Sequence, residues 1–550
     1  MNDRKPDRAG LGRRSFLTML GAGAATPLLA SCGSGPESGS EAANGPVSSA
    51  DVDAAIPDYI PRDIVEPDFP GVDGSTPGYL NYPAEFLPSV DGVPGRGSSF
   101  TAMTPLWANV PPGLPENQYM VAVNEEINAD FQFQITDGNS YGEKLQAVLA
   151  AESSVPDFVT IPSWTVPQRF DEALATLFTD LTPYLAGDLI EEYPNLANLD
   201  SDAWRCCVFG GRLYALPYPS DLINSVIFYR HDLADELGLE VAPRNTDDFL
   251  ALAQEITDPS NNRWAMNDMW AGAQLMFGVP DQWEIDDGEL VHRFETDAYR
   301  AALEFQAELF RAGVVHPDAV AGNEQQARQR FISGEVLIAA DGAGSWLSAT
   351  REAYPGNPEY NQQPIPPFAH DGGTPVIYKG TPSNLFTFIK QTDDADRIRE
   401  QLALANYFAA PFGTKEQMLL EYGTEGVHHE LDADNVPTLT SLGQREVART
   451  YTWITRPPVV AAQVQYPSFV KDFSTWMADA MQYTVEPPFF TQQIVEPTEF
   501  AALEQPFIDL EKDIARGRSD ISELDGAIEN WRAAGGDRMR EFYAEYLEQS

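Results

Sequence analysis

Several tryptophan and tyrosine residues in this sequence of 550 residues stand within a few positions of a side chain that can form hydrogen bonds. The sets are Trp107 with Asn109, Ser163 with Trp164, Tyr218 with Asp221 and Asn224, and Asp341 with Trp346. An indole or phenol ring packs against the C–H face of a sugar ring, while amides, hydroxyls and carboxylates bond its hydroxyl groups. A buried polar group without a partner costs about 1 to 3 kcal/mol, so such side chains discriminate between isomers. These residue types favour binding of a polyhydroxylated solute.

Predicted β-strands lie next to all four sets. Apolar runs at residues 100–104, 158–161 and 336–340 each end just before a set, and the set that begins at Tyr218 precedes a run at 226–229. In open α/β sheets, ligands bind beyond the carboxyl ends of the strands. We therefore expect the four sets to surround one cleft.

Helical patterns alternate with these strands, as at residues 141–149, 246–256 and 297–312. Ser140 and Glu143 have the spacing of a capping box at the start of the first of these helices. The alternation predicts two mostly parallel sheets with helices on both faces. From residue 394 onward the patterns are mainly helical.

The stretch RRSFLTMLGAGAATPLLASC, residues 13–32, carries the features of an export signal. Its apolar run is shorter than the about 20 residues that a transmembrane helix needs. The twin arginine resembles a Tat signal, and the residues LASC that end the stretch resemble a bacterial lipobox. We expect removal of residues 1–31 and a diacylglyceryl group on the Cys32 sulfur. Because about two acyl chains give stable anchoring, the prediction is a protein held by lipid at the extracellular face of the cell membrane.

The sequence is strongly acidic, with 83 Asp and Glu against 35 Lys and Arg, a net charge of −48. Such a surface repels nucleic acid and anionic lipid headgroups, so we expect no nucleic-acid partner and contact with the membrane only through the lipid on Cys32. Apart from Cys32, the only cysteines are the adjacent Cys206 and Cys207, which are too close for an ordinary disulfide. They offer no framework for structural zinc. We expect two buried free thiols, no metal and no cofactor.

Two segments precede the predicted α/β region. Residues 32–50 contain Gly, Ser and Pro but almost no bulky apolar side chain, which predicts a flexible spacer. Residues 51–97 keep the prolines and add Ile, Phe, Tyr and Leu. The prolines exclude long helices, and the apolar residues can anchor the chain, so we expect an ordered strap along the surface of a domain.

Two stretches, FGGRLYALPYPSDLINSVIFYRHDLADELGL (209–239) and PRNTDDFLALAQEITDP (243–259), resemble the extracellular solute-binding proteins of ABC importers, in the cluster that includes maltose-type binding proteins. Three others resemble the LipO-like lipoprotein branch: YGEKLQAVLAAESSVPDFVTIP (141–162), YGTEGVHHELD (422–432) and ISELDGAIENWRAAGGDRMREFYAEYLEQ (521–549). Glu425 and His428 in the second of these, and Trp270 in a polar, turn-rich stretch, are further candidates for ligand contact.

The resemblance implies an α/β fold of the periplasmic-binding-protein type, a clamshell of two lobes with a helical C-terminal region. We place the first lobe at residues 98–222 and 345–393 and the second at 223–344 and 394–550. Such a protein would be a monomer without enzymatic activity. It would capture an oligosaccharide or related carbohydrate between its lobes and deliver it, by closing, to the permease subunits of an ABC importer.

One departure from the family pattern concerns calcium. Relatives often carry an acidic, glycine-containing loop where this chain has DPSNNRW, residues 258–264. This run lacks the glycine for the sharp turn of a calcium loop, and Met269 stands where a twelfth-position acid would be needed. We expect a turn here and no metal site.

Three alternative functions stay open. A peptide-binding importer component would share the architecture but should present charged groups to both peptide termini. A secreted glycoside hydrolase needs only two carboxylates, although the sequence has no GxSxG, HExxH or GxxxxGK[ST] motif. A surface lipoprotein without a small ligand would line its cleft with core residues such as Leu and Val.

Overall fold

The computed structural model describes residues 47–62, 64–107, 109–167 and 170–548. The predicted signal peptide, Cys32 and most of the predicted spacer lie outside these residues. Within them, no helix combines the length and the apolar character needed to cross a membrane.

The first sheet has five strands in the order β2, β1, β3, β14, β6. Their bounds are Ser99–Leu106 for β1, Asp130–Asp137 for β2, Phe158–Pro162 for β3, Ala215–Pro219 for β6 and Ser383–Ile389 for β14. β1 runs parallel to β2 and β3, whereas β14 is antiparallel to both β3 and β6. Every residue of β3 and of β6 is buried, which is typical of strands covered on both faces.

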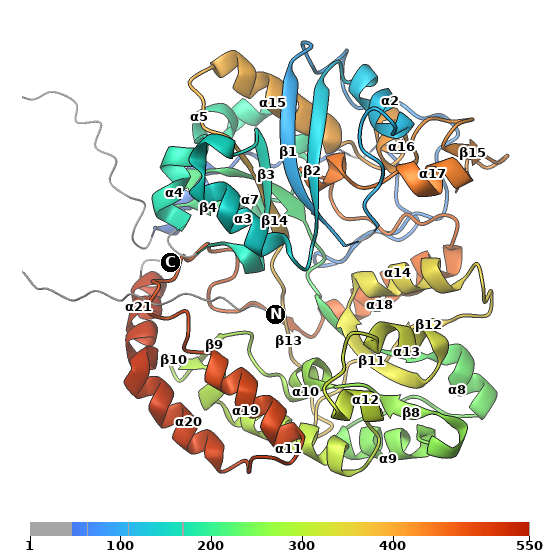
Figure 1. The fold of residues 1–550 in the computed structure, drawn as a ribbon, viewed down its shortest axis with the longest axis vertical. Helices are drawn as coiled ribbons and strands as arrows, with labels where there is room; N and C mark the ends of the chain where they lie inside the picture. Colours follow the sequence, from blue (N-terminus) through green and yellow to red (C-terminus); the bar gives the residue numbers. More distant parts are fainter. Residues whose placement is uncertain (1–46, 63, 108, 168–169, 549–550) are drawn as a thin grey trace, which may run out of the picture. The chain divides into compact units, whose positions relative to one another are not determined.

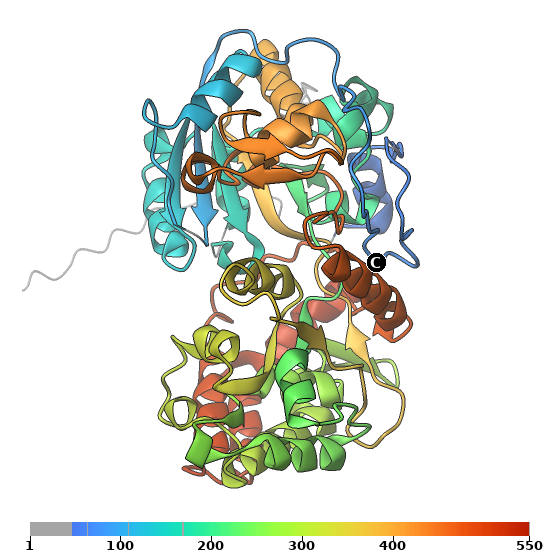
Figure 2. The ribbon, with the colours of Figure 1, turned by 90° about the vertical axis from the view of Figure 1, so that its right-hand side faces the viewer.

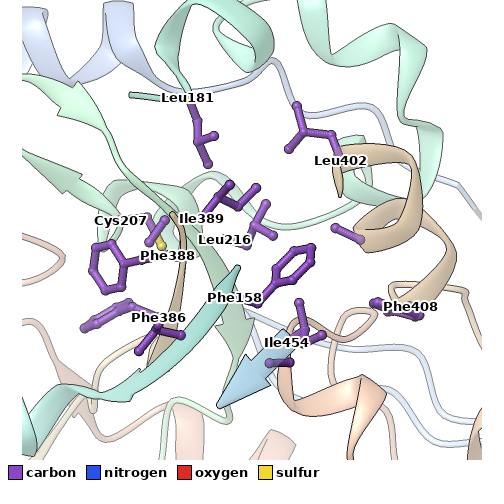
Figure 3. Close-up of a cluster of buried hydrophobic side chains, with 14 of the residues drawn as sticks. Phe158, Leu181, Cys207, Leu216, Phe386, Phe388, Ile389, Leu402, Phe408 and Ile454 are labelled. Atoms are coloured by element: carbon purple, nitrogen blue, oxygen red, sulfur yellow. The ribbon is translucent and has the colours of Figure 1, made fainter. Parts of the chain in front are cut away.

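A phenylalanine-rich core surrounds this sheet. Phe158, Phe386 and Phe388 project from neighbouring strands (Figure 3). Leu402 and Phe408 reach the same cluster from α15. The helices that contribute to this core and lie around the sheet in Figure 1 include α2 (Gln118–Glu126), α3 (Tyr141–Ala150), α4 (Phe170–Leu177) and α15 (Ala395–Phe408). We call these elements the first lobe.

The second sheet has four strands in the order β12, β7, β11, β8. Their bounds are Ser225–Arg230 for β7, Trp264–Met266 for β8, Val336–Gly342 for β11 and Gln362–Pro364 for β12. Helices α9 (Thr246–Ile256), α10 (Trp270–Phe277), α11 (Asp297–Arg311), α19 (Gln505–Ala515), α20 (Glu523–Trp531) and α21 (Asp537–Leu547) share its core. α14 (Gly344–Ala353) and α18 (Pro467–Met481) form a further cluster against β7 and β11. We call these elements the second lobe.

The prediction of an α/β fold built on two sheets is confirmed. In each sheet, all strands but one run in the same direction, and the exceptions are β14 and β7. Each exception is the first strand of its sheet after the chain has crossed from the other lobe. Such a strand begins at the edge of the sheet where the neighbouring strands have their carboxyl ends. It therefore runs antiparallel to them.

The lobe boundaries differ from the prediction after residue 344. The sequence assignment puts residues 345–393 in the first lobe, but β12 pairs with β7 of the second sheet and α14 packs on the same sheet. It also puts everything from residue 394 in the second lobe, whereas α15 fills the first core. Periodicity identifies these elements correctly but does not show which sheet they cover, because both lobes bury the same residue types.

The strap, residues 51–97, lies along the first lobe, as Figure 2 shows for the dark blue part of the chain. The backbone N–H of Ser89 donates to the carboxylate of Glu416 at 2.9 Å, and that of Tyr79 donates to the carbonyl of Ala461 at 2.8 Å. Hydrogen bonds to parts of the chain more than 300 residues away thus fix the strap.

The two adjacent cysteines and the turn at residue 258 lie as the sequence predicts. Cys206 and Cys207 are free and buried, and burial raises the pKa of the Cys206 thiol to about 12. Asp258 accepts hydrogen bonds from Ser260 and Asn261 within a single 3-10 turn. In the part of the chain that the structure describes, no group of three or more His, Cys, Asp or Glu residues is placed to hold a metal ion.

Candidate ligand-binding site

Four aromatic side chains form a continuous row from the surface of the first lobe to a cavity. The ring centroids of Trp164 and Trp107 are 5.8 Å apart, and those of Trp107 and Trp453 are 5.6 Å apart. Trp453 stacks on Tyr218 with centroids 5.1 Å apart and an interplanar angle of 18°. Trp164 is 63% exposed, Trp107 41% and Tyr218 only 6%. This aromatic row therefore leads from a solvent-facing indole to a phenol in the wall of the cavity.

The ends of neighbouring strands bring the two exposed indoles together. Trp107 directly follows β1, and Trp164 lies in the 3-10 helix η2 (Ser163–Thr165), directly after β3. Gly138, which follows β2, donates its backbone N–H to the carbonyl of Leu106 at 3.0 Å. A side chain at position 138 would overlap the Trp107 indole. The missing side chain therefore lets the indole lie directly on the backbone.

The cavity at the inner end of the aromatic row has a volume of about 210 Å³. Its walls come from the strap, from the end of β6, from α14 and α18 of the second lobe, and from α16 (Lys415–Tyr422) and the segment 449–463. The polar side chains that line it include Thr76, Tyr82, Tyr218, Asp221, Arg351, Gln417, Glu421, Tyr422, Arg449, Thr452, Arg456 and Gln463. Phenylalanines and prolines make up much of the rest. Such a mixture can bury an apolar surface and also bond polar groups.

Arg456 lies at the junction of the aromatic row and the cavity. Its guanidinium carbon is 4.1 Å from the centroid of the Tyr218 ring. Nη1 donates to the Tyr218 hydroxyl at 3.1 Å, and Nε donates to the carbonyl of Pro219 at 2.8 Å. A cation over the face of a phenol is favourable, so ring and guanidinium hold each other in place.

Both carboxylates of the cavity have partners. Asp221 accepts a hydrogen bond from the Thr76 hydroxyl. Burial raises the pKa of Asp221, and the bond from Thr76 opposes that rise. A carboxylate oxygen of Glu421 lies 4.0 Å from Nε of Arg449. The negative charge of Glu421 is the main reason that the pKa of Arg449 is raised.

Neutral hydrogen-bonding groups line the side of the cavity formed by the strap. The hydroxyl groups of Tyr82 and Tyr422 are 3.2 Å apart, and the Gln465 amide donates to the Tyr422 hydroxyl at 3.2 Å. Burial raises the pKa of Tyr82 well above its ordinary value. Because the phenol stays protonated at neutral pH, it can both donate and accept.

The structure brings together part of the set predicted from sequence. Tyr218 and Asp221 line the cavity, and Trp107 and Trp164 form the outer part of the aromatic row. Ser163 precedes Trp164 in the same turn. These residues share the property that guided their selection, which is a position at or just beyond the end of a strand in the first sheet.

Two other predicted residues lie at exposed positions outside the cavity lining. Asn109 is exposed in the segment after β1. Asn224 is exposed where the chain crosses from β6 to β7, and its amide lies against Gly380, where any side chain would collide with it. Asn224 thus packs against the segment 379–382, through which the chain returns to the first lobe.

Three residues predicted for the site in the second lobe lie outside this cavity. Trp346 is 2% exposed and packs against Phe228 and Phe469, because α14 begins directly after β11 and turns this indole into the core. Trp270 packs edge-on against Tyr299, with ring centroids 5.6 Å apart. Asp341 is exposed and borders a separate, smaller cavity. None of the three lines the cavity at the end of the aromatic row.

Glu425 and His428 also lie outside the cavity lining. His428 is 1% exposed, and its Nδ1 accepts a hydrogen bond from the backbone N–H of Thr424 at 3.1 Å. Its Nε2 is 3.7 Å from the Glu446 carboxylate. Burial lowers the pKa of His428, and the Glu446 charge opposes this. His428 therefore stabilises its own loop, and Glu425 is exposed on that loop and does not line the cavity.

Sequence reasoning missed most of the cavity lining, including Arg351, Arg449 and Arg456, and also Trp453 of the aromatic row. Trp453, Arg449 and Arg456 belong to an irregular segment that includes only a short 3-10 helix, η6 (Tyr451–Trp453). No strand precedes this segment, so a rule based on strand ends cannot select it. The signal available in the sequence is the run YTWITRPP (451–458), where aromatic residues, arginine and proline occur together.

A family model and two relatives match this sequence. The family model described as bacterial extracellular solute-binding protein matches residues 112–403. Lipoprotein LipO of Bacillus subtilis (strain 168) is 21% identical over 475 residues, which cover 81% of this chain and 91% of that protein. The polygalacturonan/rhamnogalacturonan-binding protein YtcQ of the same strain is 22% identical over 465 residues, covering 79% of this chain and 89% of that protein.

A solved structure shows the same fold at lower identity. The N-glycan transport solute-binding protein (NgtS) from Streptococcus pneumoniae, in complex with Man1GlcNAc, superposes with a TM-score of 0.56 at 14% identity. The match covers 82% of this chain and 100% of that one.

Proposed function

Because the chain belongs to the family of bacterial extracellular solute-binding proteins, we propose that it is the binding component of an ABC importer whose solute is an oligosaccharide or related carbohydrate. The observation that carries the proposal is the aromatic row that ends in a cavity lined by hydroxyl, amide and charged groups. A relative whose name says that it binds polygalacturonan and rhamnogalacturonan supports a saccharide as the solute.

The chemistry of the site suits successive sugar units. A pyranose exposes flat C–H faces, which pack on aromatic rings, and the exposed indoles of Trp107 and Trp164 can each support one such face. The hydroxyl groups around the sugar need donors and acceptors, which Tyr82, Tyr422 and Gln417 supply from the cavity wall. A chain of sugars can therefore lie along the row with its end in the cavity.

Delivery to the importer would follow from closure of the two lobes on the solute. The cavity takes residues from both lobes, such as Tyr218 from the first and Leu347 from the second. A solute that contacts both stabilises the closed state by its differential affinity. Shifting the population from 1:99 to 99:1 requires about 5.5 kcal/mol. Permease subunits that recognise the closed form would then receive the loaded monomer.

A lipid on Cys32 would keep the protein at the extracellular face of the membrane, close to its importer. The support is the lipobox-like sequence before Cys32, the Tat-like arginine pair and the similarity to a lipoprotein. Changing Cys32 to Ser should move the protein from the membrane fraction to the medium. Retention of the Cys32→Ser variant in the membrane fraction would contradict anchoring at this residue.

The central test is a thermal-shift and calorimetric screen of the purified full chain against oligosaccharides. A solute at 100 times its dissociation constant should stabilise the folded state by about 2.7 kcal/mol. Trp164→Ala should weaken the response, while Trp270→Ala, which removes an indole outside the site, serves as the control. If peptides raise the melting temperature and no saccharide does, the proposal is wrong.

We propose binding without catalysis. The hydrolase alternative needs two carboxyl groups that flank the bond to be cleaved, whereas Asp221 and Glu421 already contact Thr76 and Arg449. Prolonged incubation with each bound oligosaccharide should therefore return the saccharide intact. Release of shorter products by the purified chain would establish an enzyme instead.

A further inference from the structure

Two buried threonines lie side by side in the phenylalanine-rich core of the first lobe. Thr160 of β3 and Thr387 of β14 are direct partners in the antiparallel pairing of these strands. Their exposed fractions are 0% and 1%, and their hydroxyl oxygens are 2.8 Å apart. A buried hydroxyl group is costly unless it has a hydrogen-bond partner. This threonine pair is therefore expected to bond a specific polar group within the core.

That group is the backbone carbonyl of Trp453. Oγ1 of Thr160 lies 3.3 Å from the carbonyl oxygen, and Oγ1 of Thr387 lies 3.5 Å from it. Each hydroxyl has one hydrogen to donate. The distances favour a chain in which Thr387 donates to Thr160 and Thr160 donates to the carbonyl. The threonine pair thus holds the backbone of an irregular segment against the sheet.

Further contacts hold the same segment on this sheet. Figure 3 shows Ile454 in the same hydrophobic cluster as Phe158. The hydroxyl of Thr455 donates to the carbonyl of Pro217 in β6 at 2.8 Å. The carbonyl of Trp453 itself lies at the end of η6, where carbonyls have no partner within their own helix. The threonine pair supplies the donor that this helix end requires.

The continuity of the aromatic row depends on Trp453. Its ring contacts Trp107 on the solvent side, with centroids 5.6 Å apart, and Tyr218 on the cavity side, with centroids 5.1 Å apart. Only a short 3-10 helix contains this residue, so regular secondary structure does little to fix its position. A shift of its backbone would separate the exposed indoles from the cavity.

We propose that Thr160 and Thr387 are positioning residues for the solute site, which act by fixing Trp453 between the exposed indoles and the cavity. This inference rests on the proposed function and assigns a role in it to two residues that are too deeply buried to contact the solute. Without the hydroxyl pair, Trp453 is correctly placed in only a fraction of the molecules. The apparent affinity falls in proportion to that fraction, and one net hydrogen bond corresponds to about a fivefold change.

Two substitutions at position 160 separate positioning from a structural role. Thr160→Val keeps the shape of the side chain but removes the hydroxyl, and it should weaken saccharide binding about fivefold. Thr160→Ser keeps the hydroxyl but removes a methyl group from the core, so it should lower the melting temperature and leave the affinity unchanged. Calorimetry on the purified full chain at pH 7 with maltotriose, cellotriose and trigalacturonate, together with thermal melts without saccharide, measures both properties. A purely structural role predicts that affinity follows stability in both variants.

Thr104→Val is the matched control. Thr104 of β1 is 0% exposed in the same sheet, but its hydroxyl has no hydrogen-bond partner among the described residues. Its replacement removes a buried hydroxyl without releasing any segment, so the affinity for saccharide should stay unchanged. An equal loss of affinity in Thr104→Val and Thr160→Val would overturn the inference, because the effect would not depend on the bond to Trp453.

A double-mutant cycle tests whether the effect passes through Trp453. In the Trp453→Ala background, Thr160→Val should cause no further loss of affinity, because the ring that the threonine pair positions is gone. The same loss in both backgrounds overturns the inference. Unchanged affinity in a chain that combines Thr160→Val with Thr387→Val, or equal weakening by Thr160→Ser and Thr160→Val, also overturns it and leaves saccharide capture intact. If neither these three saccharides nor any in the screen bind the unmodified chain, the proposed function falls with it.

Discussion

Trp164 and Trp346 have the same side chain and opposite surroundings. Trp164 is 63% exposed at the outer end of the aromatic row, whereas Trp346 is 2% exposed among Phe228, Phe469 and Phe473. Both follow a strand, so the rule that ligands bind beyond the carboxyl ends of strands selects both. The difference arises because a short 3-10 turn presents Trp164 outward, while α14 starts at once after β11 and carries Trp346 under the sheet.

This contrast gives a prediction at the level of single residues. Trp164→Ala should weaken saccharide binding by about 1 to 3 kcal/mol and leave the melting temperature of the unliganded protein nearly unchanged. The substitution removes ring stacking and apolar contact with the ligand. Trp346→Ala should instead destabilise the fold by about 3 to 5 kcal/mol, since it opens a core cavity.

Thermal melts and calorimetric titrations of the two variants, measured side by side, check this prediction. A large loss of stability in Trp164→Ala would mean that its indole belongs to the core. A stable Trp346→Ala variant would contradict the packing described for the second lobe.

At the scale of elements, single carboxylates connect parts of the chain that are distant in sequence. Asp157 accepts the backbone N–H of Thr101 in β1 at 2.8 Å and pairs with Arg397 of α15 at 2.8 Å. Burial alone would raise the pKa of Asp157, but these hydrogen bonds and the Arg397 charge outweigh it and lower the pKa below its ordinary value. The carboxylate therefore stabilises the first lobe in its ionised form.

The lowered pKa predicts how stability depends on pH. A group whose pKa is depressed by folding contributes fully above its unfolded pKa, about 3.9 for Asp, and loses its contribution as the pH falls through the folded value. Asp157→Asn should cost roughly 1 to 3 kcal/mol at pH 7. The difference from the unmodified chain should stay constant down to about pH 5 and shrink below about pH 4.

Chemical denaturation of both proteins across this pH range measures the effect. Glu430→Gln, an exposed substitution on β15 (His429–Leu431), is the control and should show no such trend. A difference that grows as the pH falls would contradict the assigned role of Asp157.

The strap depends on a second carboxylate. Both oxygens of Glu416 accept the backbone N–H of Ser89 at 2.9 Å, and Val90 donates to the same group at 3.3 Å. Glu416→Ala should speed amide hydrogen exchange in residues 77–97 by roughly tenfold, because about 1 to 3 kcal/mol of local hydrogen bonding is lost. It should also weaken ligand binding, since Tyr82 of the strap lines the cavity.

Hydrogen exchange followed by mass spectrometry resolves this segment from the rest of the chain. Glu304→Ala, an exposed substitution on α11, is the matched control. Unchanged exchange in the strap of Glu416→Ala would show that other contacts hold it.

The sequence predicts much of the fold at this scale but only part of the site. Alternating strands and helices, a capping position such as Thr296 and the glycine that ends α8 (His231–Leu237) are local signals, so they predict elements well. The lobe to which α14 or α15 belongs depends on contacts between distant segments, which no local pattern encodes. The same holds for Trp453 and Arg456, which the fold brings to the strand ends from an irregular segment far along the chain.

At the scale of the whole molecule, the proposed function requires that ligand binding change the relation between the two lobes. The cavity contains residues of both, so a bound solute adds contacts that the empty protein lacks. Small-angle scattering with a saturating saccharide should show a smaller radius of gyration than without it. The variant Trp164→Ala should need a higher saccharide concentration to reach the same compact state.

Scattering profiles that stay identical while calorimetry reports binding would contradict closure. A neutral disaccharide that gives no calorimetric signal is the control for an effect of added solute on the profile.

The participation of Thr76 and Tyr82 in the cavity wall has a practical consequence for protein engineering. The cores of the two sheets lie mostly downstream of residue 98, so a shortened version beginning at β1 would keep the strands of both sheets. It would nevertheless lack the part of the cavity wall that the strap supplies. A fluorescent sensor made from this protein should therefore keep the strap, residues 51–97, and carry its dye elsewhere.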